Sequence, residues 1–118
     1  MVGYFRMTVK EIALNQGFRI MTRDLAALEK EVTGVYACDL LSNAMAKLNK
    51  GDVWITVHTN LNVVAVASLS EASCVLIPEA IEIEEQTIER ADLKNVAILS
   101  SPKSASEISF NLLSLKRE

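Results

Sequence analysis

GDVWITVHTNLNVVAVASLSEASCVLIP, residues 51–78, is the stretch that decides the fold. It contains two apolar runs: Val53–Val57, which follows the turn pair Gly51-Asp52, and Cys74–Ile77, which ends at Pro78. Consecutive apolar residues are typical of a strand that is covered on both faces, as in a parallel sheet with crossover helices. The stretch therefore predicts a βαβ unit at the centre of a small α/β domain.

The segment between the two apolar runs carries conflicting local signals. Asn60 is a good N-cap for a helix, whereas Val63, Val64 and Val66 favour a strand by propensity. The distance along the chain between the two predicted strands is only about the minimum length of a parallel crossover, and such a crossover needs a helix. We therefore predict a helix over residues 61–70.

The N-terminal third of the chain predicts a capped helix followed by short strands. Thr8 and Glu11 have the spacing of a capping box and Gly17 suits a C-terminal end, which predicts helix 9–16. The next segments are expected to be a short strand at 18–21, one helical turn within 24–31, and a strand at 31–37 with Gly34 as a weak point or bulge.

A second helix is expected directly before the central stretch. Asp39 can cap a helix that runs from Leu40 to Leu48. The apolar residues of this helix have the spacing of a single face, and they are Leu40, Leu41, Ala44, Met45 and Leu48.

The chain after Pro78 predicts two further helices around one strand. The expected order is a connector at 79–83, a helix at 84–93, a strand at 96–99 and a helix at 105–115 capped at Ser104. Repeats, low-complexity tracts and linkers are absent from the sequence. We expect one domain over residues 7–118 after a leader at 1–6, with a largely parallel central sheet of about four to six strands flanked by helices.

Composition excludes several classes of function. The net charge is −3 and the 12 Lys and Arg residues are scattered, so a basic nucleic-acid footprint is not expected. We find neither a signal peptide nor an apolar run of membrane-spanning length, and we expect a soluble, cytoplasmic protein that does not bind membranes. Cys38 and Cys74 are expected to be buried free thiols, and with a single histidine no metal site or cofactor is predicted.

The order of these elements resembles a known family. The segments TVKEIA, GVYACDLLSNAM, GDVWITVHTNLNVVAVASL and ILSSPKSASEI resemble the DRTGG domain over about residues 7–115. The chain is also similar to the N-terminal domain of bacterial HPr kinase/phosphorylase. The resemblance implies a regulatory domain that is found alone or joined to CBS domains. Where the family commonly has Thr-Gly-Gly, this chain has Ile77-Pro78-Glu79.

Kinase activity does not follow from this resemblance. Phosphoryl transfer needs a glycine-rich loop whose amides hold the phosphates, with a lysine behind it. The chain has four glycines and none of them stands in a GxxxxGK pattern. We therefore predict that the domain is not an enzyme.

Polar residues after two predicted strands form the candidate ligand site. His58, Thr59, Asn60 and Asn62 follow the central strand, at the edge where open α/β sheets bind ligands. Ser100, Ser101 and Ser104 precede the last helix, whose free amides could hold a phosphate or carboxylate. The two loops meet only if strands 53–57 and 96–99 are parallel. Capping by Asn60 and Ser104, with His58 as an ordinary loop residue, is the simpler explanation.

Asp39 and Ser42 are further candidates because the CDLLSN segment resembles the family, although helix capping accounts for both. We predict a non-catalytic regulatory or dimerisation module that senses a small anionic metabolite or nucleotide. The alternative is a protein-interaction partner of a signalling kinase or an anti-sigma-like ATPase. In either case a homodimer is expected.

Overall fold

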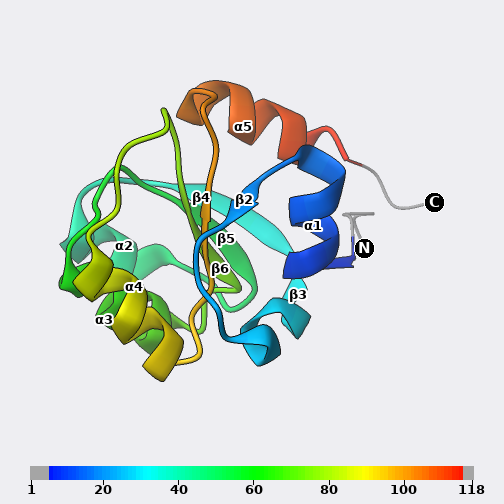
Figure 1. Ribbon diagram of the computed structural model, residues 1–118. Helices are drawn as coiled ribbons and strands as arrows, with labels where there is room; N and C mark the ends of the chain where they lie inside the picture. Colours follow the sequence, from blue (N-terminus) through cyan, green and yellow to red (C-terminus); the bar gives the residue numbers. More distant parts are fainter. Residues whose placement is uncertain (1–5, 116–118) are drawn as a thin grey trace.

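The computed structural model describes residues 6–115, which form three layers with helices on both faces of a central sheet (Figure 1). Apart from Arg6, the predicted leader at 1–6 lies outside the described residues. The predicted α/β class is confirmed.

The central sheet has five strands in the order β2-β7-β6-β5-β4. Its four parallel strands pair with their neighbours in chain order, whereas β2 runs antiparallel to β7. This confirms the predicted parallel pairing of the two central runs and the common direction of the strands near 53–57 and 96–99. The strands are β2 (Arg19–Ile20), β4 (Gly34–Ala37), β5 (Asp52–Ile55), β6 (Cys74–Ile77) and β7 (Ile98–Ser100).

All three crossover helices lie on one face of the sheet, because consecutive parallel strands that advance in one direction place right-handed crossovers on the same side. They are α2 (Leu41–Lys47), α3 (Leu61–Ser70) and α4 (Glu85–Leu93). The predicted helix 61–70 is thus confirmed.

The other face is covered by the two ends of the chain. Helices α1 (Val9–Gln16) and α5 (Ala105–Leu113) pack there with the 3₁₀ helix η1 (Leu25–Glu29). A small antiparallel ribbon of β1 (Met7–Thr8) and β3 (Glu31–Val32) completes this layer. The capping box of Thr8 and Glu11 and the left-handed C-cap at Gly17 are both present, as predicted.

Two cores explain why the central strands are apolar at every position. Trp54 and Val75 pack toward α2, α3 and α4, whereas Ile55 and Leu76 pack toward α1 and α5. Successive side chains of a strand point to opposite faces, so a strand covered on both sides needs apolar residues throughout.

The central strand ends earlier than predicted. It ends at Ile55 rather than Val57, and Val57 is 43% exposed. The amide of Thr56 still donates to the carbonyl of Leu76 over 3.2 Å, but the chain then turns away from the sheet. β7 likewise begins at Ile98 rather than at residue 96.

The strand predicted at 31–37 is two strands that belong to different sheets, β3 and β4, with the break at Thr33. Gly34 pairs regularly with Asp52 in the parallel ladder, so it is not a bulge. A Cβ at Gly34 would lie 2.5 Å from the carboxylate Oδ1 of Asp52. This close approach, rather than a weak point in the strand, accounts for the glycine.

The helix predicted from Leu40 to Leu48 is shorter, and its apolar face is narrower than predicted. Ala44 and Leu48 are buried, whereas Leu40 is 65% and Met45 is 54% exposed. Leu40 occupies the N-cap position and makes no capping side-chain hydrogen bond. The predicted cap residue, Asp39, is engaged elsewhere.

Candidate functional site

The predicted site residues lie at the carboxyl edge of the parallel sheet, but they form two groups. The loop 56–60 follows β5 and the loop 101–104 follows β7, and β6 lies between these two strands. The structure therefore places both loops at one edge, as predicted, without making them neighbours in the sheet.

Asp39 joins the end of β4 to the loop after β5. Its carboxylate Oδ1 accepts a hydrogen bond from the Thr56 hydroxyl at 2.8 Å and one from the Val57 amide at 2.9 Å. The imidazole Nε2 of His58 contacts the backbone carbonyl of Asp39. Asp39 therefore holds two loops together and does not cap α2, contrary to the prediction.

Among the other polar residues of the β5–α3 loop, Asn60 makes a side-chain hydrogen bond, whereas Thr59 and Asn62 are held through their backbone. The side chain of Asn60 accepts from the amide of Asn62 at 3.0 Å, which is the predicted cap of α3. The carbonyl of Thr59 accepts from the hydroxyl of Thr87 on α4 at 2.7 Å. Ser42 is exposed in the first turn of α2.

The serines after β7 are likewise held within the fold. Ser101 is buried, and its hydroxyl accepts from the amide of Lys103 at 3.2 Å. Ser104 accepts from the amide of Glu107 at 3.2 Å and so caps α5, as predicted. Ser100 is the last residue of β7 and pairs with Arg19.

A crevice is expected between β6 and β7, because the helices that follow these neighbouring strands pack on opposite faces of the sheet. Backbone hydrogen bonds close it. The amides of Glu79 and Ala80 donate to the carbonyls of Lys103 and Ser101, both at 2.9 Å, and the amide of Ser101 donates to the carbonyl of Ile77 at 3.0 Å. The polar groups of this edge therefore stabilise loops.

Cys38, next to Asp39, belongs to a similar network. The indole Nε1 of Trp54 donates to the carbonyl of Cys38 at 2.9 Å, and the Asn43 amide contacts the Cys38 thiol at 3.6 Å and the Tyr36 hydroxyl at 2.9 Å. The hydrogen bond that the Asn43 amide donates to the sulfur lowers the pKa of Cys38. Cys38 is half-buried rather than buried as predicted.

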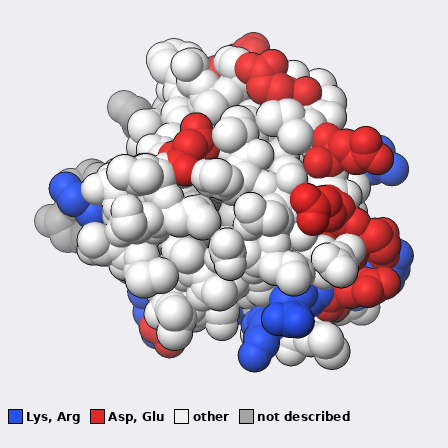
Figure 2. All heavy atoms as spheres, turned by 90° about the vertical axis from the view of Figure 1, so that its left-hand side faces the viewer, with Lys and Arg blue, Asp and Glu red and all other residues white. Residues whose placement is uncertain are grey.

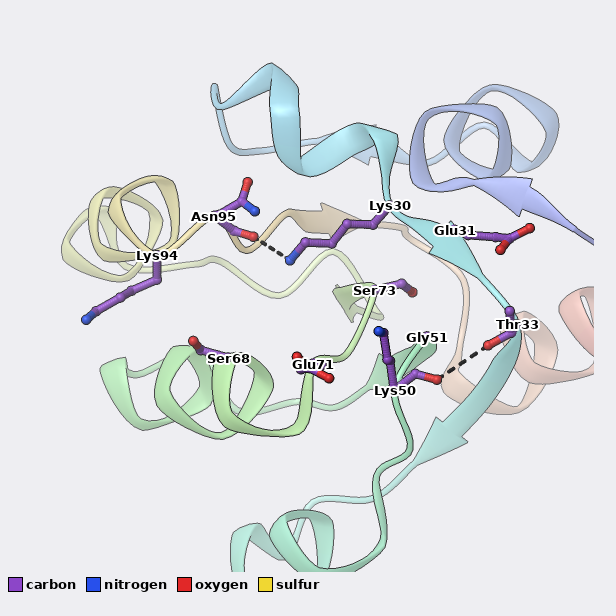
Figure 3. A pocket seen from close by; sticks show the side chains of 10 residues that line it. All are labelled: Lys30, Glu31, Thr33, Lys50, Gly51, Ser68, Glu71, Ser73, Lys94 and Asn95. Atoms are coloured by element: carbon purple, nitrogen blue, oxygen red, sulfur yellow. Dashed lines mark hydrogen bonds between the residues drawn. The ribbon is translucent and has the colours of Figure 1, made fainter.

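A cavity of about 550 Å³ lies at the opposite, amino edge of the sheet (Figure 3). This volume is within the usual range of small-molecule sites. The lining side chains come mostly from positions just before a strand or just after a helix, and nearly all are polar. They are Lys30, Glu31, Thr33, Lys50, Gly51, Ser68, Glu71, Ser73, Lys94 and Asn95.

The cavity carries an excess of positive charge. Among residues 6–115, no carboxylate lies within 4.0 Å of the ammonium groups of Lys30, Lys50 or Lys94. Glu31 pairs with Arg6 at 3.9 Å and points away from the cavity in Figure 3, whereas Lys50 and Glu71 point into it. Lys94 points outward in Figure 3, so two cations, Lys30 and Lys50, face one carboxylate that is directed inward.

Lys30 is partly desolvated at one wall of the cavity. Its ammonium donates to the backbone carbonyl of Asn95, and burial lowers the pKa of Lys30. A desolvated cation without a paired anion is stabilised when an anionic ligand approaches.

The backbone around the cavity is closely packed. Gly51 has φ +89°, and a Cβ there would lie 2.2 Å from the hydroxyl of Thr33. The amide of Gly51 donates to the carbonyl of Glu71 at 3.0 Å, and the buried hydroxyl of Ser73 donates to the carbonyl of Asp52 at 3.0 Å. The lining side chains therefore project from a backbone that is held in place.

Sequence reasoning missed this cavity. Its lysines lie far apart along the chain, and each taken alone looks like a solvated surface residue. The position of these residues in the sequence could have indicated the cavity. Strands begin one or two residues after Lys30, Lys50 and Ser73. Parallel strands bring such positions to one edge, in the same way as the residues at their carboxyl ends.

One face of the molecule carries few basic side chains. On the side of the molecule that carries α2, α3 and α4, acidic side chains gather along one border and the centre is largely uncharged (Figure 2). Within residues 6–115 no helix has the length and apolar character needed to cross a bilayer. The same residues contain no cluster of three His, Cys, Asp or Glu side chains suited to hold a metal ion.

Comparison of the sequence with known protein families and with curated proteins finds no match. Among solved structures, the fold is similar to the CBS and DRTGG domains of the regulatory region of Clostridium perfringens pyrophosphatase, a structure determined with the activator diadenosine tetraphosphate. The TM-score is 0.72 at 14% identity, over 92% of this chain and 47% of that chain. The chain thus has a DRTGG-related fold and spans about half of that structure.

Proposed function

We propose that this domain is a non-catalytic regulatory module that senses a small anionic metabolite or nucleotide in the cavity at the amino edge. The observation that carries the proposal is the pair of lysines without paired carboxylates, Lys30 and Lys50, at a cavity of about 550 Å³. The proposal moves the site away from the His58 and Ser101 loops, where the side chains of His58, Asn60, Ser101 and Ser104 already have partners within the fold.

The similar structure supports a sensing role. It is a regulatory region that binds a nucleotide activator, and it shares its fold with this chain. The predicted homodimer, the cytoplasmic location and the likeness to HPr kinase belong to the same proposal. A signalling-protein partner remains an alternative prediction.

The proposal is tested by calorimetric titration of the domain with AMP, ATP and inorganic pyrophosphate. We expect at least one of these anions to bind, and Lys50→Ala to weaken binding about tenfold because one charged contact with the ligand is lost. The thermal stability of the variant should remain unchanged, since Lys50 is exposed and unpaired with a carboxylate among the described residues.

The matched control is Lys103→Ala, which removes an exposed lysine from the carboxyl edge. This variant should bind as the unaltered domain does. Weakened binding in Lys103→Ala with full binding in Lys50→Ala would place the ligand at the carboxyl edge and contradict the proposed site. Failure of all three anions to bind the unaltered domain would contradict anion sensing itself.

A further inference from the structure

Glu71 occupies a backbone position at which a side chain is unfavourable. It is the C-cap of α3 and adopts a left-handed conformation, with φ 58° and ψ 37°. Glycine is the usual residue at such helix ends because a Cβ is crowded in this conformation. The backbone of Glu71 alone completes the turn, since its amide donates to the carbonyl of Ser68 and its carbonyl accepts from Gly51. The turn therefore does not explain the carboxylate.

The exposed carboxylate of Glu71 attracts the ammonium of Lys30 but makes no direct contact with it. Among residues 6–115, it makes no side-chain hydrogen bond and no ion pair within 4.0 Å. Figure 3 shows it directed into the cavity, near Ser68 and facing the side chain of Lys50. A hydrogen-bond acceptor therefore lies beside cations that are available to a ligand.

This combination restricts the chemistry of the ligand. A purely anionic group such as inorganic phosphate would contact the lysines but would be repelled by Glu71, and a cation would be repelled by Lys30 and Lys50. A ligand that carries both a phosphate and a hydroxyl satisfies both sets of groups. The phosphate accepts from ammonium groups, and the hydroxyl donates to the carboxylate.

The remaining lining residues favour a sugar phosphate over a base. No aromatic side chain is among the residues that line the cavity, so the cavity offers no stacking surface for a nucleobase. Ser68, Ser73 and Asn95 instead add hydroxyl and amide groups that can pair with a polyol.

We infer that the cavity selects a phosphorylated sugar, either free or as the ribose phosphate of a nucleotide, and that Glu71 is the residue that recognises the sugar hydroxyl. The inference rests on the proposed function, because it assigns a ligand class to the same cavity. Lys50 and Lys30 contact the phosphate, and Glu71 distinguishes a phosphate with a neighbouring hydroxyl from a phosphate without one.

The experiment compares ribose 5-phosphate, AMP and inorganic phosphate by calorimetry on the unaltered domain and on Glu71→Gly. Glycine is chosen because it suits the left-handed position and so preserves the turn. We expect ribose 5-phosphate to bind at least about tenfold more tightly than inorganic phosphate. In Glu71→Gly this preference should disappear, while inorganic phosphate should bind equally well or more tightly.

The other outcomes separate the two proposals. Equal loss of ribose 5-phosphate and inorganic phosphate in Glu71→Gly, with an unchanged melting temperature, would overturn the role of Glu71 and leave anion sensing intact. Binding of AMP more than about tenfold tighter than ribose 5-phosphate would overturn sugar-phosphate recognition in favour of base recognition. Absence of binding by every phosphate to the unaltered domain would overturn the proposed function.

A second variant, Glu71→Gln, controls for the possibility that Glu71→Gly alters the fold. Glu71→Gln keeps the size of the side chain and an acceptor oxygen but removes the charge. It should retain part of the preference for ribose 5-phosphate and should bind inorganic phosphate more tightly than the unaltered domain does. A preference identical to that of the unaltered domain, without tighter phosphate binding, would count against a charged role for Glu71.

Discussion

At the carboxyl edge of the sheet, the carboxylate of Asp39 accepts from the Thr56 hydroxyl and the Val57 amide, whereas at the amino edge the ammonium of Lys50 has no carboxylate within 4.0 Å among the described residues. One edge uses its polar groups to join loops. The other leaves charged groups directed into a cavity. Polar residues at the ends of parallel strands therefore do not by themselves indicate a ligand site; what matters is whether their hydrogen bonds are already made within the fold.

Topology accounts for the difference. The loops after β4, β5 and β6 all lead to helices on one face, and the only divergence among the parallel strands of the described chain, between β6 and β7, is bridged by backbone hydrogen bonds. At the amino edge, the end of α3 lies opposite Lys30 and β3 with the cavity between them, and the loop before β7 contacts Lys30 through the carbonyl of Asn95. The hollow thus forms where the small ribbon joins the main sheet.

The largest expected effect is a difference in thiol reactivity between the two cysteines, one of which lies at each edge of the sheet. Cys38 follows β4 at the carboxyl edge, is half-buried and has a lowered pKa, whereas Cys74 begins β6, is buried and has its pKa raised by burial to about 12. A thiol-reactive dye at pH 8 should modify Cys38 at least about a hundredfold faster than Cys74, which reacts only on unfolding.

The measurement follows dye release with time on the native domain, with Cys38→Ala as the control that removes the fast phase. In denaturant both thiols should react at similar rates. Two equally fast phases in the native domain would show that β6 opens readily at its amino end.

Asp39→Ala should have the next largest effect, a loss of about 1–2 kcal/mol of unfolding free energy, because the buried Thr56 hydroxyl and the Val57 amide lose a charged acceptor. Urea unfolding followed by Trp54 fluorescence measures this loss. Asp39→Asn keeps an acceptor oxygen and should lose less.

The control for this prediction is Ser42→Ala, at an exposed position in the first turn of α2, which should change stability by no more than about 0.5 kcal/mol. A loss in Ser42→Ala comparable to that in Asp39→Ala would point to capping of α2 as the source of the stability. That result would support the helix-capping role that the sequence predicted for this segment.

The smallest effect is on the pH dependence of stability. The Cys74 thiol ionises near pH 9 in the unfolded chain and near 12 in the folded one, so the unfolded state binds fewer protons between these values. Stability should therefore fall as the pH rises above 9, by at most about 1.4 kcal/mol per unit. The lowered pKa of Lys30 acts in the opposite direction and reduces the net slope.

Melting temperatures between pH 8 and 10 test this prediction. Cys74→Ala should flatten the alkaline decrease relative to the unaltered domain, even though the smaller side chain lowers stability at every pH. Cys38→Ala should leave the decrease largely in place. An identical slope in the unaltered domain and in Cys74→Ala would assign the decrease to other groups.

Local sequence signals determined most of the secondary structure. The capping box at Thr8, the N-cap at Asn60 and the apolar run Cys74–Ile77 each predicted an element that is observed, because caps and burial on both faces act through residues close in sequence. The resemblance to the DRTGG domain is confirmed at the level of the fold.

Only the tertiary structure decided which polar residues remain available. Asp39 has the sequence context of a helix cap, yet its partners, Thr56 and Val57, come from the next strand and its loop. The sheet brings three distant segments to one edge, and only there do Lys30, Lys50 and Glu71 line a common cavity. The sequence determined the elements and the absence of a phosphate-binding glycine loop. The location of the open cavity depends on which strands pair and on which face of the sheet each connecting segment packs. Neither is encoded by a local sequence pattern.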